Sequence, residues 1–171
     1  MDIGDVVVRA ARVSDVPELV RLSGIMYAEA PCHGSAAPGP WQQAAAATLR
    51  RVLAGPDPDW AIAVVDGDRP GELASCAMGA IEHRIASPRV PDGRAGHIFN
   101  VATDPGHRER GYARACVEAI LRWHRGRGAH RVDLIATPAA APMYRTIGFD
   151  PEIGGEALRW YADTPLPSAD D

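Results

Sequence analysis

The stretch "TDPGHRERGYARACVEAILRWHRGRG" (residues 103–128) carries the strongest helix signal in the chain, and the other elements are arranged around it. From position 113 its apolar residues recur at the three- and four-residue spacing of a helix with one buried face. They are Ala113, Cys116, Val117, Ile120 and Leu121, with His124 on the same face. The glycines at 126 and 128 end the helix. The sequence therefore predicts a long amphipathic helix that packs on a core.

The residues at the start of this helix, "RERGYA" (108–113), are unusual for a helix N-terminus. Free amides and the helix dipole make that end electropositive, so a carboxylate is normally found there. Two arginines and a glycine suggest instead that the anion is a ligand, bound by the amides around Gly111. A solvated turn with three surface charges is the alternative, because short motifs are weak evidence.

A strand is predicted on each side of the helix. "AGHIFNVAT" (95–103) precedes it and "HRVDLIAT" (130–137) follows it, and both are rich in residues that favour strands. This order of strand, helix and strand forms a right-handed crossover, which makes the two strands parallel neighbours. The mouth of such a crossover is a usual ligand site.

The remaining segments complete a mixed α/β pattern. We expect strands at 6–11 and 156–162, and helices at 14–29, 41–53 and 139–148. Two apolar runs, which begin at 59 and 72, are separated by the turn residues "DGDRPG" (66–71) and predict an antiparallel hairpin. Asp15 and Glu18 have the spacing of a capping box at the start of the first helix. We expect a single domain, 1–165, and a disordered tail, 166–171.

Composition argues against several classes of protein. The net charge of −4 disfavours binding to free DNA or RNA, which usually leaves a basic excess. All 18 basic residues are arginine, which excludes the lysine-dependent P-loop, pyridoxal and kinase sites. We expect a cytoplasmic protein with no membrane partner, because we find no apolar run of about 18 residues and no signal-like start. The scattered Cys32, Cys76 and Cys116 predict reduced thiols and no metal site.

Four motifs, in order along nearly the whole chain, resemble those of the GNAT acetyltransferases. "RERGYA" resembles the R/Q-x-x-G-x-G/A signature of that family, with Ala113 in place of the more usual second glycine. "VATDP" (101–105), "AAAPMYRTIGF" (139–149) and an R-x-A-x-x-x-D opening (9–15) stand where the family has them. The resemblance implies a mixed sheet splayed into a V between its fourth and fifth strands, with about four flanking helices. It also implies that acetyl-coenzyme A lies in the gap and is the anion expected at the helix start.

The resemblance assigns the coenzyme to two segments. It gives the backbone of Val101, Ala102 and Thr103 to the pantetheine arm and the acetyl carbonyl. It gives the pyrophosphate to a loop that consists of Arg108, Glu109, Arg110, Gly111, Tyr112 and Ala113. The loop needs neither a lysine nor a metal ion.

Acetyl transfer to an amine needs a donor for the oxyanion, a proton for the departing thiolate and a base for the amine. A backbone amide of residues 101–103 can serve as the donor. Tyr144 stands where the family keeps the tyrosine that protonates the thiolate. His97 stands where one branch of the family has its glutamate base, and imidazole titrates in a suitable range. Glu82, His83 and a water relay are the alternatives for the base.

The resemblance therefore predicts an N-acetyltransferase that carries acetyl from acetyl-coenzyme A to a primary amine, by direct attack in a ternary complex. The amine can belong to a small molecule or to a protein. We expect Tyr27, Glu29, Glu82 and Asn100 to contact it. A monomer and a homodimer are both compatible with the sequence. A coenzyme-binding sensor or scaffold without turnover is the alternative function.

Overall fold

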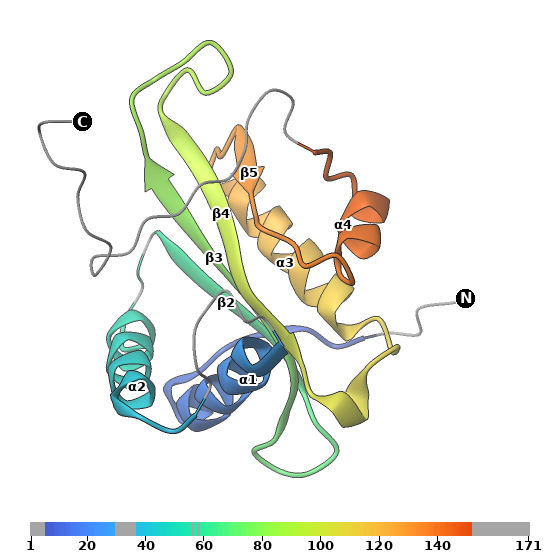
Figure 1. Ribbon diagram of the computed structural model, residues 1–171. Coiled ribbons are helices and arrows are strands. Elements are labelled where there is room, and N and C mark those ends of the chain that lie inside the picture. Colours follow the sequence, from blue (N-terminus) through green and yellow to red (C-terminus); the bar gives the residue numbers. More distant parts are fainter. Residues whose placement is uncertain (1–5, 30–36, 56, 58, 152–171) are drawn as a thin grey trace, which may run out of the picture.

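The computed structural model describes residues 6–29, 37–55, 57 and 59–151, and Figure 1 shows how their helices and strands are arranged. The elements are β1 (Arg9–Ala10), η1 (Val13–Asp15), α1 (Val16–Glu29), α2 (Pro40–Leu53), β2 (Trp60–Asp66), β3 (Leu73–His83), β4 (Arg94–Thr103), η3 (Pro105–His107), α3 (Tyr112–Gly126), β5 (Arg131–Asp133) and α4 (Ala141–Ile147). The two η elements are short 3-10 helices. Within this part of the chain, no helix has the length and apolar character needed to cross a membrane.

The strands form one mixed sheet in the order β1-β2-β3-β4-β5. Neighbours pair antiparallel from β1 to β4, whereas β5 pairs parallel with β4. The predicted hairpin is therefore confirmed, and so are the mixed α/β class and the parallel pair on either side of α3. β1 and β5 are shorter than the sequence predicted. The strand expected at 156–162 and the tail at 166–171 lie outside the described residues.

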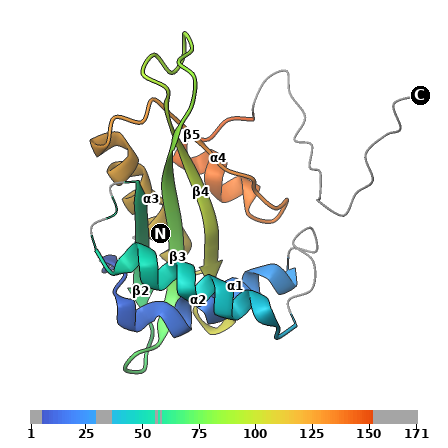
Figure 2. The same cartoon turned by 90° about the vertical axis from the view of Figure 1, so that its left-hand side faces the viewer.

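Helices cover both faces of the sheet. Figure 2 shows α1 and α2 on the near side of the sheet and α3 and α4 behind it. The core on the α1 side includes Leu19, Leu22, Ile62, Val64 and Met78. The core on the α3 side includes Ala77, Ile98, Cys116, Val117 and Ile120. The predicted apolar face of α3 is thus its buried face, and removing these side chains from water stabilises the fold.

β4 extends well beyond its parallel partner. β5 pairs with β4 only from Ala95 to His97, and β4 continues to Thr103. A bulge in the extended part shifts the register of β4 against β3. Asn100 lies in this bulge with a φ of 46°, in the left-handed region that few residues adopt. Beyond His97 the two strands part, which is the splay that the resemblance implied.

A buried histidine fixes the position of α3 on the sheet. His124 has no exposed surface, and its Nε2 donates a hydrogen bond of 3.0 Å to the carbonyl oxygen of Ala80. Gly96 leaves room for the ring, since a Cβ there would lie 2.6 Å from His124 Cδ2. Burial holds the pKa of His124 below its usual value. The imidazole is therefore a neutral structural group.

The start of α1 differs from the predicted capping box. Asp15 belongs to η1, and its carboxylate accepts hydrogen bonds from the amide of Arg12 (2.7 Å) and from the guanidinium of Arg9 (2.7 Å and 3.0 Å). Glu18 accepts a hydrogen bond of 3.0 Å from the amide of Leu73. The prediction was wrong because Asp15 binds groups that precede α1, and Glu18 binds Arg21 and the amide of Leu73 rather than the start of the helix. Glu18 instead ties α1 to the start of β3.

Candidate functional site

A cavity of about 870 Å³ opens where β4 and β5 part. Its walls come from the free end of β4, the loop after η3, the start of α3, the segment before α4 and the last turns of α1. The predicted site residues that line it are Val101, Ala102, Thr103, Arg108, Glu109, Gly111, Tyr112, Ala113, Tyr144 and Glu29. Both predicted coenzyme segments and the predicted acid therefore meet in one cavity.

The loop between η3 and α3 has the backbone geometry of an anion site. Gly111 is the N-cap residue of α3, its φ is 77°, and no side chain caps the helix. Glu109 also has a positive φ, 60°. Left-handed residues in a turn aim neighbouring amides toward one side, and the first amides of a helix have no partner within it. Together with the dipole of the 15-residue α3, these amides favour an anion in the cavity.

The two arginines of the signature have different roles. Arg108 lines the cavity, and its Nη2 lies 2.6 Å from Oε1 of Glu29 at the end of α1. Arg110 donates a hydrogen bond of 3.3 Å to the carbonyl oxygen of Gly106, and it does not line the cavity. Of these two arginines, Arg108 is therefore the one whose guanidinium a bound anion can reach, and the anion would compete with Glu29 for it.

Asp104 holds the chain just before this loop. Its carboxylate accepts hydrogen bonds from the amide of Gly106 (2.9 Å) and from Arg21 of α1 (2.5 Å). These donors hold its pKa below the usual range. Arg21 also binds Glu18 (2.8 Å) and the carbonyl oxygen of Leu73 (3.0 Å). One guanidinium thus joins α1, β3 and the approach to the loop.

Tyr144 projects from α4 into the cavity. The residue is 7% exposed, and its ring packs edge to face on Phe149 at a centroid distance of 5.8 Å. Within the described residues its hydroxyl has no hydrogen-bond partner. Burial raises the pKa of Tyr144 to about 12. The phenol is therefore protonated at neutral pH and can donate a hydrogen bond to a thiolate that forms in the cavity.

His97 lies outside the cavity lining. Its register neighbours are Ala80 in β3 and Asp133 in β5, and its ring stacks on Phe99 at 5.7 Å. Phe99 packs against the core on the α1 side, which places His97 on that side of β4. The cavity begins further along the strand, at Val101. A base at His97 would therefore act on an amine that approaches from the α1 side.

The alternative bases are engaged with other groups at the far end of β3. Glu82 accepts a hydrogen bond of 2.9 Å from Nε of Arg84. Nε2 of His83 lies 3.2 Å from the carboxylate of Asp59. Neither residue lines the cavity.

Of the four residues predicted to contact the amine, Glu29 alone lines the cavity. Tyr27 packs edge to face on Trp41 of α2 at 5.2 Å. The side-chain amide of Asn100 donates a hydrogen bond of 3.0 Å to Oγ of Ser23 in α1. Tyr27 and Asn100 therefore join α1 to its neighbours.

Part of the cavity wall was missed by the sequence reasoning. The missed residues are Ile25, Met26, His107, Arg114, Thr137, Pro138, Ala139, Ala140 and Met143. The small residues of "PAAA" (138–141) were a usable signal, because they allow a ligand to approach the backbone before α4. The α1 residues gave no such signal, since apolar positions on a helix are usually core.

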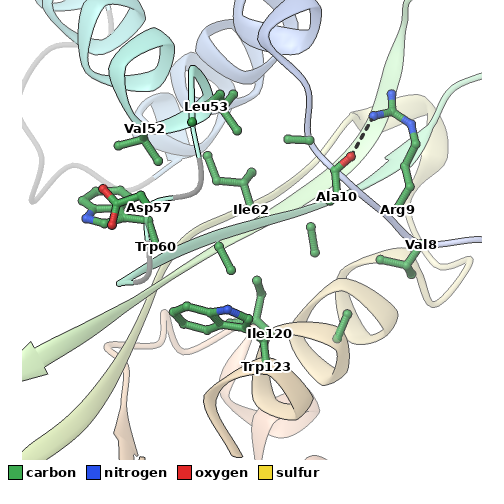
Figure 3. Close-up of a pocket in the computed structure, with 15 residues that line it drawn as sticks. Val8, Arg9, Ala10, Val52, Leu53, Asp57, Trp60, Ile62, Ile120 and Trp123 are labelled. Atoms are coloured by element: carbon green, nitrogen blue, oxygen red, sulfur yellow. Dashed lines mark hydrogen bonds between the residues drawn. The ribbon is translucent and has the colours of Figure 1, made fainter. Parts of the chain in front are cut away.

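A second cavity, of about 440 Å³, lies beside β2 at the other edge of the sheet. Figure 3 shows Trp60 and Trp123 on opposite sides of β2, with mostly aliphatic side chains between them. The guanidinium of Arg9 is held by Asp15 and Asp66. The charged groups that the structure describes here are thus largely used in internal contacts, and the walls are mainly apolar. This cavity offers less for acyl transfer than the cleft at β4.

The thiols do not supply a nucleophile. Cys76 and Cys116 are buried, and burial raises the pKa of each to about 12, so both remain protonated at neutral pH. Cys32 lies outside the described residues. Among the described residues, no three His, Cys, Asp or Glu side chains lie together in a way that could hold a metal ion.

The chain thus has a mixed α/β fold with a splayed sheet, and the free amides at the start of α3 face the cleft between β4 and β5, where such folds usually bind their ligands. Residues 24–149 match the model of the acetyltransferase (GNAT) family, and the chain belongs to this family.

One curated enzyme is similar in sequence to about half of this chain. The chain is 29% identical, over 91 residues, to glucosamine 6-phosphate N-acetyltransferase 1 of Oryza sativa subsp. japonica. The match covers 53% of this chain and 53% of the rice protein, so it spans about half of the length of that relative.

Solved structures share the fold at low sequence identity. A protein of Clostridium acetobutylicum that is named as a predicted acetyltransferase, solved with acetyl-CoA, superposes with a TM-score of 0.75 at 19% identity, over 90% of this chain and 95% of that one. Glucosamine-6-phosphate N-acetyltransferase of Arabidopsis thaliana gives 0.73 at 18% identity, over 92% and 98% of the two chains. These similarities establish the fold.

Proposed function

We propose that the protein is an N-acetyltransferase that moves the acetyl group of acetyl-coenzyme A to a primary amine, by direct attack in a ternary complex. The observation that carries the proposal is that one cavity joins the loop 108–113 to Tyr144 along the free end of β4. An extended substrate with phosphates at one end and a thioester at the other matches this arrangement. The Clostridium acetyltransferase, which has the same fold and was solved with acetyl-CoA, supports the choice.

Coenzyme binding would use two segments of backbone. The amides at the start of α3, with Arg108, would bind the pyrophosphate. The backbone of Val101, Ala102 and Thr103, which no described strand covers on the β5 side, would bind the pantetheine arm and the thioester carbonyl. Gly111 is suited to its place because φ of 77° strains any residue with a Cβ.

The chemical step has a donor for each developing charge. The amine nitrogen attacks the acetyl carbonyl carbon, a C–N bond forms, and a backbone amide of residues 101–103 donates to the oxyanion. The C–S bond then breaks, and the thiolate takes the hydroxyl proton of Tyr144. The amine loses its extra proton to His97, directly or through one water. The tyrosinate regains a proton from solvent after product release.

The test compares several amines as acetyl acceptors, because the proposed function names a primary amine without its carbon skeleton. The rice and Arabidopsis relatives are named for glucosamine 6-phosphate, which makes this amino sugar the first candidate. The panel should also contain an alkyl diamine, an aromatic amine and a short peptide with a free N-terminus.

The experiment measures free thiol released from acetyl-coenzyme A with and without each amine, and the mass of the product. The proposal predicts that thiol release depends on one class of amine. It also predicts a product that is heavier than that amine by the mass of one acetyl group, about 42 Da. Binding of the coenzyme without amine-dependent release across the panel would favour the sensor or scaffold instead.

A further inference from the structure

The imidazole ring of His107 is buried beside the coenzyme loop (residues 108–113). It is the last residue of η3, comes directly before Arg108 and is 6% exposed. Neither ring nitrogen has a hydrogen-bond partner among the described residues. Buried polar groups normally have partners, so this imidazole needs an explanation.

Each ring nitrogen faces a carboxylate from a different part of the chain. Nε2 lies 3.3 Å from Oδ2 of Asp68, in the turn between β2 and β3. Nδ1 lies 3.7 Å from Oδ1 of Asp104. A neutral imidazole has one N–H and one lone pair, so one nitrogen would turn its lone pair toward a carboxylate. An imidazolium has two N–H groups and suits both carboxylates.

The imidazole also lies against the far end of the loop. Its ring centroid is 6.4 Å from that of Tyr112, the first residue of α3, and both residues line the cavity. His107 thus touches the loop at both ends, through the peptide bond to Arg108 and through the ring of Tyr112. Asp104, on its other side, is fixed by Gly106 and Arg21.

The other charged groups around the His107 ring do not supply the positive charge that a protonated imidazole would add. Glu72 at the start of β3 is a third carboxylate whose pKa is lowered, first by Arg69 and also by His107. The nearby arginines are themselves paired: Arg69 binds Glu72 at 2.9 Å, and Arg21 binds Asp104 at 2.5 Å. A proton on His107 therefore adds a cation next to a loop that is shaped to bind an anion.

We propose that His107 is a positioning residue for the coenzyme loop, and that coenzyme binding is coupled to its protonation. The imidazolium draws Asp68 and Asp104 onto its two N–H groups, holds both ends of the loop and adds positive charge beneath the bound phosphates. Coenzyme then binds more tightly as the pH falls, and by linkage its binding takes up protons. The inference rests on the proposed function, because it concerns the same coenzyme.

The test titrates the full chain with coenzyme A by calorimetry at pH 8, 7 and 6, in buffers of different ionisation enthalpy. The variants are His107→Asn and, because a buried substitution can impair folding, Asp68→Asn, whose side chain is 76% exposed. His130→Gln is the matched control, since His130 also faces a carboxylate, Asp92 at 3.6 Å, but lies at the surface away from the loop. Titration of the coenzyme phosphates is common to all four proteins and cancels in the comparison.

Between pH 8 and pH 6, the affinity of the wild type for coenzyme A should rise at least about fivefold more than that of His107→Asn or Asp68→Asn, here called the loop variants. The wild type should also take up more protons on binding than either of them. His130→Gln should behave as the wild type. Equal pH dependence and equal proton uptake in the wild type and both loop variants would overturn the inference while leaving the proposed function intact. No binding of coenzyme A by the wild type at any pH would refute the proposed function itself, and this inference with it.

Discussion

Tyr144→Phe removes one oxygen atom from the candidate site and leaves the ring. Within the described residues the hydroxyl has no hydrogen-bond partner, so its removal leaves no unsatisfied group behind. The edge-to-face packing on Phe149 at 5.8 Å is retained. We therefore expect the free energy of unfolding to change by less than about 1 kcal/mol, and the affinity for coenzyme to stay the same.

Turnover, in contrast to stability and coenzyme affinity, should fall strongly in Tyr144→Phe. The pKa of Tyr144, raised by burial to about 12, keeps the proton on the phenol until the thiolate forms. Loss of a positioned general acid typically costs about 10²-fold to 10⁴-fold in rate. At about 1.4 kcal/mol for each factor of ten, this is roughly 3 to 5 kcal/mol of transition-state stabilisation.

The assay is amine-dependent thiol release, with a single-turnover measurement to show that chemistry limits the rate. Thr137→Val is the matched control, because it deletes a hydroxyl from the same cavity, in the segment before α4. It should retain turnover within about threefold, since no step of the proposed chemistry uses that hydroxyl. Similar rates for Tyr144→Phe and Thr137→Val would show that Tyr144 only packs.

Three further predictions test other parts of the account. At 100 times its dissociation constant, acetyl-coenzyme A should stabilise the wild type by about 2.7 kcal/mol; Gly111→Trp, placed at a φ of 77°, should lose this shift in a thermal-unfolding assay, and a retained shift would remove the loop from the coenzyme site. His97→Gln should abolish the acid limb of the kcat/KM profile and restore part of the activity at high pH; an unchanged limb would assign it to another group. Because burial lowers the pKa of His124 in the folded protein, the unfolded chain binds the proton more readily, so urea unfolding should show full stability above about pH 6.5 and a loss as the pH falls below it; the same loss in His124→Gln would show that other groups cause it.

The elements with strong local patterns were predictable. The apolar spacing of Cys116, Val117 and Ile120 identified the buried face of α3. The arginines and the glycine before it marked the loop that the structure places at the cavity. Periodicity and helix-end chemistry are local properties, so a sequence displays them directly.

Features that depend on contacts between distant segments were not predictable. The spacing of Asp15 and Glu18 matched a capping box, but Glu18 accepts from the amide of Leu73, 55 positions away. The bulge at Asn100 and the pairing of His107 with Asp68 likewise depend on how strands and turns meet. The tertiary environment decided these contacts, and no local signal preceded them.

The proposed function requires that the cleft between β4 and β5 binds acetyl-coenzyme A with its thioester next to Tyr144. A crystal structure of the complex tests it most directly. We expect the pyrophosphate on the amides at the start of α3, the pantetheine along residues 101–103, and the sulfur within hydrogen-bond distance, about 3 to 4 Å, of the Tyr144 hydroxyl. A coenzyme bound elsewhere, such as in the cavity beside β2, or one whose sulfur lies far from Tyr144, would contradict it.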